Sequence, residues 1–233
     1  MEKVLYLLNA PEGPSGDSLR DQLVDDVAPR LLTAGAHGVQ VNVMDSGVEA
    51  AAGARMRSGT GPCPDAMVSV WVDSANGPLR AAHDKVLREV NPDLIAYLVA
   101  ESAPLPGDPV DGRRPGYTQV SFLQRPEGLD EPSWLAHWHD HHTQVAIDTQ
   151  ATTRYVQNFV VRALTPGAPP CTAVVEEVFP IEAMTDQSVF FDAVGDDERR
   201  QANAEALMDS VQAFLDFDLI DVVPTSEYSL SRT

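Results

Sequence analysis

Cysteine and basic residues are both scarce in this sequence. The two cysteines, Cys63 and Cys171, lie far apart in loop-like surroundings, and no Cys-x-x-Cys pair or Cys/His spacing indicates a zinc site. The chain has 16 Lys and Arg residues against 35 Asp and Glu residues, which gives a formal net charge of −19. Because nucleic acids and anionic membranes are bound through cationic side chains, this balance argues against both as partners.

Long apolar runs and nucleotide-binding motifs are also missing. No segment approaches the roughly 18 consecutive apolar residues of a membrane-spanning helix. The N-terminal segment lacks the cationic and apolar regions of a signal peptide, so we expect a cytoplasmic protein. No Gly-x-Gly-x-x-Gly, Walker loop or Gly-x-Ser-x-Gly occurs, and nucleotide-dependent chemistry and serine hydrolysis therefore have no support in the sequence.

What the sequence does contain is a repeated order of secondary structure. Of its 233 residues, 43% are hydrophobic, which is enough for a packed core. Alternation and apolar spacing predict strand, helix, strand, strand, helix and strand in the first half. These elements cover residues 3–9, 17–32, 38–44, 66–72, 77–90 and 93–100. This order is that of the ferredoxin-like, or split βαβ, unit.

The same order recurs after a segment rich in Pro and Gly, which is typical of a linker. The second set comprises a strand at 118–123, a helix at 131–147, strands at 154–162 and 172–179, helical sequence at 181–191 and 197–214, and a strand from 219. We therefore predict two ferredoxin-like domains, at residues 1–103 and 117–233, joined by a linker at 104–116.

Short identities between the halves favour a tandem duplication. Pro11-Glu-Gly13 matches Pro126-Glu-Gly128, Val39-Gln40 matches Val156-Gln157, and Asp93-Leu-Ile95 matches Asp218-Leu-Ile220. The halves differ in chemistry, because Gln22, Leu23 and Val27 stand where the second half has His137, Trp138 and His142. A site built from polar aromatic residues therefore belongs to the C-terminal half.

The most unusual stretch is residues 133–142, which hold two of the three tryptophans and four of the six histidines. Indole and imidazole side chains favour a helix less than those of Ala, Glu or Lys. Their concentration in one predicted helix indicates a role beyond the stability of that helix.

This stretch and its surroundings resemble the EthD family. The resemblance rests on Phe122-Leu-Gln-Arg-Pro126, His137-Trp138 followed by His142, Arg154-Tyr-Val-Gln-Asn158, Glu176-Glu-Val-Phe179 and Glu182-Ala-Met184. It covers roughly residues 117–226, and its motifs are moderately specific as a set. The family commonly has His directly after the Gln-Asn pair, where this sequence has Phe159. The N-terminal half would then be a diverged copy.

The resemblance implies an α+β fold of the dimeric α/β-barrel type. Members of that superfamily pack two ferredoxin-like sheets face to face, usually across a homodimer. A fused pair would form the barrel within one chain as a pseudo-dimer, with or without a further homodimer. The superfamily includes cofactor-free monooxygenases, haem enzymes, polyketide cyclases, isomerases and small decarboxylases or dehydratases, and EthD itself accompanies ether degradation by a cytochrome P450 system. Fold alone does not fix the activity.

His142 is the first candidate for a catalytic residue. It follows Trp138 by four positions on one predicted helix, and an imidazole beside an indole in an apolar pocket can act as a general acid or base. The alternative is a core histidine bonded to a backbone carbonyl. Asn158 and Glu176 lie in strands that should be buried, where they would orient His142 or the substrate, or bond only to His142 or the backbone. Glu176 and Glu177 must point to opposite faces, and the family match favours Glu176.

The predicted substrate-binding residues are Phe122, Trp134, His137, Trp138 and Tyr155. The tryptophans and Phe122 could wall a pocket for a flat apolar ligand, or they could fill the space between helix and sheet. Tyr155 could donate a proton to a developing oxyanion, or it could only pack. The spacing of His137 and His141 could hold a metal, but no third ligand is evident, and no metal is expected.

These residues favour an EthD-like enzyme that performs cofactor-independent acid–base chemistry, such as decarboxylation, dehydration or cyclisation. Its substrate would be a small apolar or aromatic molecule of catabolism or secondary metabolism. The alternative is a non-catalytic accessory or ligand-binding protein that works with an oxygenase system, and a third hypothesis is haem binding through a histidine. Loss of turnover in His142→Ala would distinguish the first hypothesis from the second.

Overall fold

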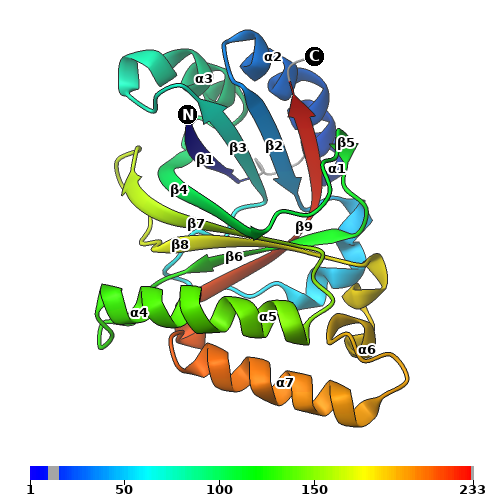
Figure 1. The fold of residues 1–233 in the computed structure, drawn as a ribbon. Helices are drawn as coiled ribbons and strands as arrows, with labels where there is room; N and C mark the ends of the chain where they lie inside the picture. The colour runs from blue at the N-terminus through cyan, green and yellow to red at the C-terminus, as the bar shows by residue number, and fades with distance from the viewer. Residues whose placement is uncertain (10–15, 232–233) are drawn as a thin grey trace.

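The computed structural model describes residues 1–9 and 16–231, in which strands and helices alternate along the chain (Figure 1). The strands are β1 (Glu2–Leu8), β2 (Gly38–Val43), β3 (Ala66–Val72), β4 (Ile95–Leu105), β5 (Gly112–Arg113), β6 (Tyr117–Leu123), β7 (Arg154–Ala163), β8 (Ala173–Phe179) and β9 (Ile220–Ser231). The α-helices are α1 (Gly16–Asp21), α2 (Ala28–Thr33), α3 (Gly77–Val90), α4 (Glu131–His137), α5 (Thr143–Thr149), α6 (Gln187–Phe190) and α7 (Asp197–Gln212). The π-helical turns are η1 (Gln22–Val27) and η3 (Trp138–His142), and the 3₁₀ turns are η2 (Ser46–Ala54), η4 (Ile181–Met184) and η5 (Phe217–Leu219).

Eight of the described strands form a closed antiparallel barrel. Their order is β2-β3-β1-β4-β7-β8-β6-β9, and β9 pairs with β2 to close the sheet. The first four strands in this order come from the N-terminal half and the last four from the C-terminal half. The short strand β5 pairs with β9. The expectation of a mixed fold with a barrel-forming sheet is therefore confirmed.

Two long strands join the halves. β4 pairs with β1 through residues 95–99 and with β7 through residues 97–105. In the same way, β9 pairs with β6 through residues 220–225 and with β2 through residues 226–231. Backbone hydrogen bonds therefore cover the strand edges at both junctions, which removes sites for edge-to-edge association.

Helices cover the outside of the barrel on two opposite sides (Figure 1). α1, α2 and α3 lie over the strands of the N-terminal half, whereas α4, α5 and α7 lie over those of the C-terminal half. Because successive side chains of a strand face opposite ways, each strand contributes to one helix-covered core and to the barrel interior. The N-terminal core contains Leu23 and Val27, the C-terminal core contains Trp134 and Trp138, and the interior contains Phe122.

Each half has a π-helical turn in the middle of its first helix. Each of these helices has a series of buried residues spaced by four positions. The series is Leu19, Leu23, Val27 and Leu31 in one half, and Trp134, Trp138, His142 and Ala146 in the other. Because an α-helix has 3.6 residues per turn, residues spaced by four positions gradually move around the helix axis. A π-turn is wider, so it returns these residues to one face. The sequence predicted both helices but not the π-turns.

The other predicted elements are present with small differences. β4 continues to Leu105, two residues into the predicted linker, and β5 lies within that linker. The Gly- and Ala-rich stretch after β2 contains η2, with Val48 and Ala51 buried. The turn at Pro11-Glu-Gly13 lies outside the described residues. The division into domains at residues 103 and 117 stays a prediction.

Candidate active site

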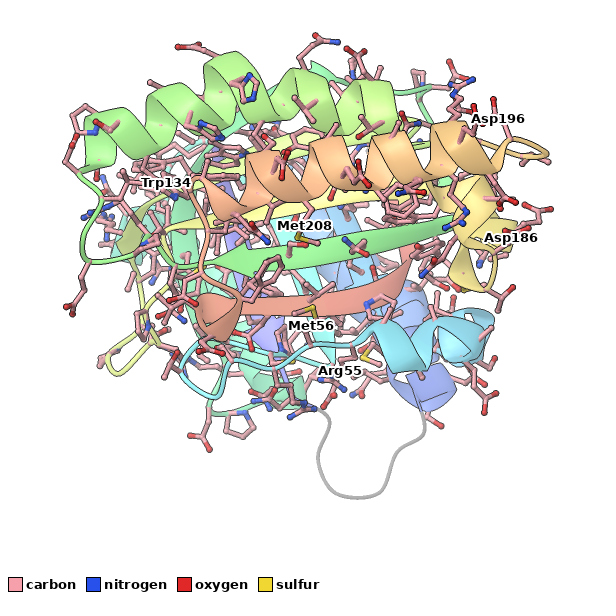
Figure 2. The ribbon with its side chains drawn as sticks, turned by 90° about the horizontal axis from the view of Figure 1, so that it is seen from below. Arg55, Met56, Trp134, Asp186, Asp196 and Met208 are labelled. Carbon is pink, nitrogen blue, oxygen red and sulfur yellow. The ribbon has the colours of Figure 1, made fainter. Side chains whose placement is uncertain are left out.

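A cavity of about 180 Å³ lies between the helices and the sheet of the C-terminal half. Figure 2 looks onto this region, where α4–α5 and α7 run side by side across the sheet, with β6 and β9 beyond α7. The polar residues that line the cavity are Gln119, Ser121, His142, Gln150, Tyr155 and Glu177. The rest of the lining is apolar, with Trp138, Phe214 and Met56 among its residues.

His142 lies at the end of η3 and is only 7% exposed. Its Nδ1 atom is 3.0 Å from the hydroxyl oxygen of Ser210 on α7, and its ring packs against Phe214 at 4.7 Å between centroids. Burial, followed by the repulsion of His137 and His141, lowers the pKa of His142 to about 4. The imidazole is therefore neutral at pH 7 and can accept a proton.

Glu177 lines the same cavity from β8, between Gln119 of β6 and Tyr155 of β7 in the strand register. It is 8% exposed, and none of the described residues forms a hydrogen bond or ion pair with its carboxyl group. Burial raises the pKa of Glu177 to about 7. Near neutral pH, this carboxyl group is therefore present in both protonated and ionised forms, as a general acid or base requires.

Hydrogen bonds connect Tyr155 to the helix that carries His142. The indole nitrogen of Trp138 donates to the Tyr155 hydroxyl oxygen at 3.2 Å. The hydroxyl of Thr143 donates to the Trp138 carbonyl at 2.7 Å and accepts from the Gln157 amide at 2.7 Å. Burial, with the nearby Glu177 charge, raises the pKa of Tyr155 above its usual range. The phenol therefore stays protonated and can serve as a hydrogen-bond donor.

The predicted catalytic residues do not all lie together. Asn158 and Glu176 face the barrel interior, on the opposite side of the sheet from His142, so the expectation that they orient His142 is wrong. Glu176 receives hydrogen bonds from Lys3 at 2.9 Å and from Asn158 at 2.9 Å, and it pairs with Arg154 at 3.3 Å. These contacts form a buried ion cluster between the two halves, with the pKa of Glu176 held below its usual range by Lys3 and Arg154 against the opposing effect of burial.

The preference for Glu176 over Glu177 as a pocket residue is therefore also wrong. The prediction that the two carboxylates point to opposite faces is confirmed by their neighbours. Strand β8 presents odd-numbered residues to the helices and even-numbered residues to the interior, and only the tertiary structure decides which face is covered by the helix of His142.

The predicted substrate-binding residues fall into two groups. Trp138 and Tyr155 line the cavity. Trp134 is fully buried, and its indole donates to the Phe214 carbonyl at 2.9 Å, which makes it part of the core. His137 lies 2.9 Å from the Ser210 carbonyl oxygen, and Phe122 faces the barrel interior. Phe159 packs against the C-terminal core and is not among the residues that line the cavity.

Sequence reasoning missed the residues that complete the cavity. Gln119, Ser121 and Gln150 drew no attention, because isolated polar residues in strands and helix ends are common. Ser210 belongs to a helix far along the chain, and nothing in the sequence pairs it with His142. The alternation of β6 does place Gln119 and Ser121 on one face, which is the one signal that the sequence offered.

Residues 1–9 and 16–231 contain neither a metal-binding cluster nor a membrane-spanning helix. This part of the chain contains no group of three or more His, Cys, Asp or Glu side chains arranged to hold a metal ion. His137 and His141 do lie together, with 5.0 Å between ring centroids. None of the helices in these described ranges is sufficiently long and apolar to cross a membrane.

Comparison with solved structures identifies the class of fold. An anthrone oxidase-like protein superposes with a TM-score of 0.54 at 11% sequence identity, over 99% of this chain and 92% of that chain. A candidate monooxygenase from Fusobacterium nucleatum gives a TM-score of 0.48 at 8% identity, over 99% and 92% of the two chains. A candidate chlorite dismutase gives 0.45 at 10% identity, over 100% and 96%. The likeness to the first of these proteins shows that the two chains share a fold.

The family comparison concerns the C-terminal half. Residues 126–218 match the model of the EthD domain, which confirms the resemblance of this half to the EthD family. The match contains both His142 and Glu177. No curated protein matches the sequence.

Proposed function

We propose that this protein is an enzyme that performs cofactor-independent acid–base chemistry on a small, uncharged, one-ring substrate. The observation that carries the proposal is the shared position of His142 and Glu177 on one largely apolar cavity. One is a neutral base and the other a carboxyl group with a pKa of about 7. Two titratable groups with such different environments are the usual basis for assigning an acid and a base.

The size and charge of the cavity define the substrate class. A cavity of about 150 Å³ accepts benzene, and this one measures about 180 Å³. The described residues that line it include no Lys or Arg, so an anionic ligand would lie near the Glu177 carboxyl group without a compensating charge. These features favour dehydration, cyclisation or enolisation of a neutral hydroxy or keto compound over decarboxylation of a carboxylate.

Each polar group has a role in such a reaction. With Ser210 accepting from Nδ1, the Nε2 atom of His142 is the site that takes a proton from the substrate. Glu177 delivers a proton to the substrate oxygen, or removes one, according to its protonation state. Tyr155 and Gln119 flank Glu177 and donate hydrogen bonds to a developing oxyanion.

The arrangement of the chain is the second part of the proposal. We infer that the halves are two tandem ferredoxin-like domains which form the barrel as an intramolecular pseudo-dimer. The same spatial order of strands in both halves, second-third-first-fourth, supports this inference. It is supported as well by the equivalent π-turns in η1 and η3. Sedimentation at monomer mass is the expected result, whereas a dimer would place a further interface outside the barrel.

Deuterium exchange into cyclohexanone tests the enzymatic proposal directly. This ketone is neutral and has one ring, and removal of its α-proton needs a base near carbon and an acid near oxygen. The wild-type protein should accelerate exchange in D₂O, followed by proton NMR, by about 10²-fold or more over buffer. His142→Ala and Glu177→Gln should lose most of this acceleration, whereas His139→Ala, at an exposed position of the same helix, should keep it.

The alternative, a ligand-binding accessory protein, is favoured by the low pKa of His142, which makes it a weak base. It predicts a bound small molecule without catalysed exchange. Mass spectrometry of the purified protein, first native and then denatured, would detect a co-purifying ligand that is lost on denaturation. A bound ligand together with exchange at the buffer rate would favour the accessory role and contradict the enzymatic one.

A further inference from the structure

One residue of the N-terminal half reaches the cavity of the C-terminal half. Met56 lies in the connection between β2 and β3 and lines the cavity beside Val222 of β9. Among the described residues that line it, Met56 alone comes from before residue 117. Figure 2 shows Met56 at β9, on the part of the sheet that lies beside α7 and is not covered by it.

The backbone of Met56 is fixed by an isolated antiparallel bridge to β9. The Met56 amide donates to the Val222 carbonyl at 3.0 Å, and the Val222 amide donates to the Met56 carbonyl at 3.1 Å. Both residues line the cavity. The position of the Met56 Cα atom relative to the cavity is therefore set by backbone hydrogen bonds to the same strand that forms the wall.

Asp221 anchors the segment that follows Met56. Its carboxylate accepts from the Ser58 amide at 2.7 Å and from the Ser58 hydroxyl at 3.0 Å, and it is only 1% exposed. Gly61 lies so close that a Cβ atom there would be 2.1 Å from an Asp221 oxygen. The Gln124 amide donates to the Thr60 hydroxyl at 2.9 Å. The segment is thus held to the C-terminal half at several points.

The side chain of Met56 has more freedom than its backbone. It is 38% exposed, and methionine is unbranched and adapts its shape to the space available. Because the Cα atom of Met56 is fixed, the length of its side chain determines how far the cavity extends at this edge. That length therefore limits the size of the ligand.

We infer that Met56 determines the ligand size that the cavity accepts, and restricts it to one ring. The inference rests on the proposed function, because it concerns the same cavity and the same neutral ligands. Shortening Met56 extends the cavity toward solvent over β9, where a second fused ring has room. The N-terminal half therefore takes part in the site by supplying the residue that selects the ligand.

Binding of phenol and of 1-naphthol to the purified full chain, measured by isothermal titration calorimetry, tests this role. Met56→Ala should raise the ratio of the 1-naphthol to the phenol association constant by about tenfold, which corresponds to ~1.4 kcal/mol. Met56→Leu, of similar volume, should retain the wild-type ratio. Met208→Ala is the matched control, because Met208 on α7 is also exposed and does not line the cavity (Figure 2).

The outcomes separate this inference from the proposed function. An unchanged ratio in Met56→Ala, with phenol still bound by the wild type, overturns the role of Met56 and leaves the proposed function standing. Binding of neither compound by the wild type overturns both. An equal rise in Met208→Ala also overturns the inference, because it would show a general loosening. Thermal unfolding of each variant verifies that the fold is intact, as expected for a substitution at an exposed position.

Discussion

The two helix-covered layers of this protein share the order of their strands and a π-turn in the first helix, but they differ in their side chains. In the N-terminal layer, Leu23 and Val27 are fully buried in an apolar core. The equivalent positions of the C-terminal layer are Trp138 and His142, and they line a cavity that also contains Glu177. A π-turn occurs in both layers, so the turn by itself does not make a site. The difference lies in which side chains the turn presents.

The connections that follow the second strand of each half differ as well. The one between β2 and β3 spans residues 44–65 and carries Met56 to the opposite half, whereas the one between β7 and β8 spans only residues 164–172. The shorter one also crosses to the other half, where the Leu164 amide donates to the Ala96 carbonyl at 2.7 Å. The longer connection lies over the layer that has the cavity. The N-terminal half thus has an apolar core under its own helices and contributes Met56 to the cavity of the other half.

The largest effect is expected from Glu176→Gln, which breaks the ion cluster between the halves. After the substitution, Lys3 keeps Glu101 and Arg154 keeps Glu227 as partners, but the buried cluster has lost one of its negative charges. The free energy of unfolding should therefore fall by about 3 kcal/mol. Denaturant unfolding at pH 7 measures this loss. A loss below about 1 kcal/mol would mean that the halves do not depend on the cluster.

The neighbouring substitution Glu177→Gln should increase the free energy of unfolding at neutral pH, whereas Glu176→Gln lowers it. The folded-state pKa of Glu177 lies above its unfolded value, about 7 against 4.5. The folded protein therefore binds more protons than the unfolded chain, and stability falls as the pH rises from 4.5 to about 7. As the pH rises from 5 to 8, the free energy of unfolding of the variant should increase by about 2–3 kcal/mol relative to that of the wild type. The reason is that the variant has no carboxyl group to ionise at this buried position. Unfolding curves at both pH values provide the measurement, and a constant difference would refute the raised pKa.

His142→Val converts the C-terminal layer toward the N-terminal one. The folded-state pKa of His142 is lowered from 6.5 to about 4, so its contribution to stability is present above pH 6.5 and is lost as the pH falls toward 4. When the pH is lowered from 8 to 5, the free energy of unfolding of the wild type should fall by about 2 kcal/mol more than that of the variant. Parallel pH profiles of the two proteins would exclude a buried neutral imidazole.

The smallest effect is expected from Ser210→Ala, which removes the hydrogen-bond partner of the His142 Nδ1 atom. Loss of one buried hydrogen bond should lower the free energy of unfolding by about 1 kcal/mol. Deuterium exchange into cyclohexanone should decrease more than binding does, because the imidazole is less well oriented. Exchange that is unaffected would show that Ser210 has only a structural role.

Much of the fold could be predicted because its signals are local. Alternation in the strands and the apolar spacing of residues such as Leu19 and Leu23 depend on neighbours in sequence, and the predicted helices and strands were found. The four-residue spacing also contained the signal of the π-turns, although the helices were expected to be regular. The end of β4 was placed too early, because its last residues pair with β7 and depend on the other half.

The site could be predicted only in part. His142, Trp138 and Tyr155 stood out by residue type, and they do line the cavity. Glu176 was chosen over Glu177, although a change of one residue reverses the face of a strand. The sequence contained the two alternatives, but it did not contain the information that separates them.

By itself, the sequence determined the repeated order of elements, the unequal chemistry of the halves, and the EthD resemblance of the second half. These properties depend on residue identity and on spacing along the chain. The tertiary structure alone decided that Glu177 and His142 share a cavity, that Lys3 and Glu176 pair between the halves, and that Met56 reaches the site. Each of these contacts joins residues from distant segments, and only closure of the barrel brings those segments together.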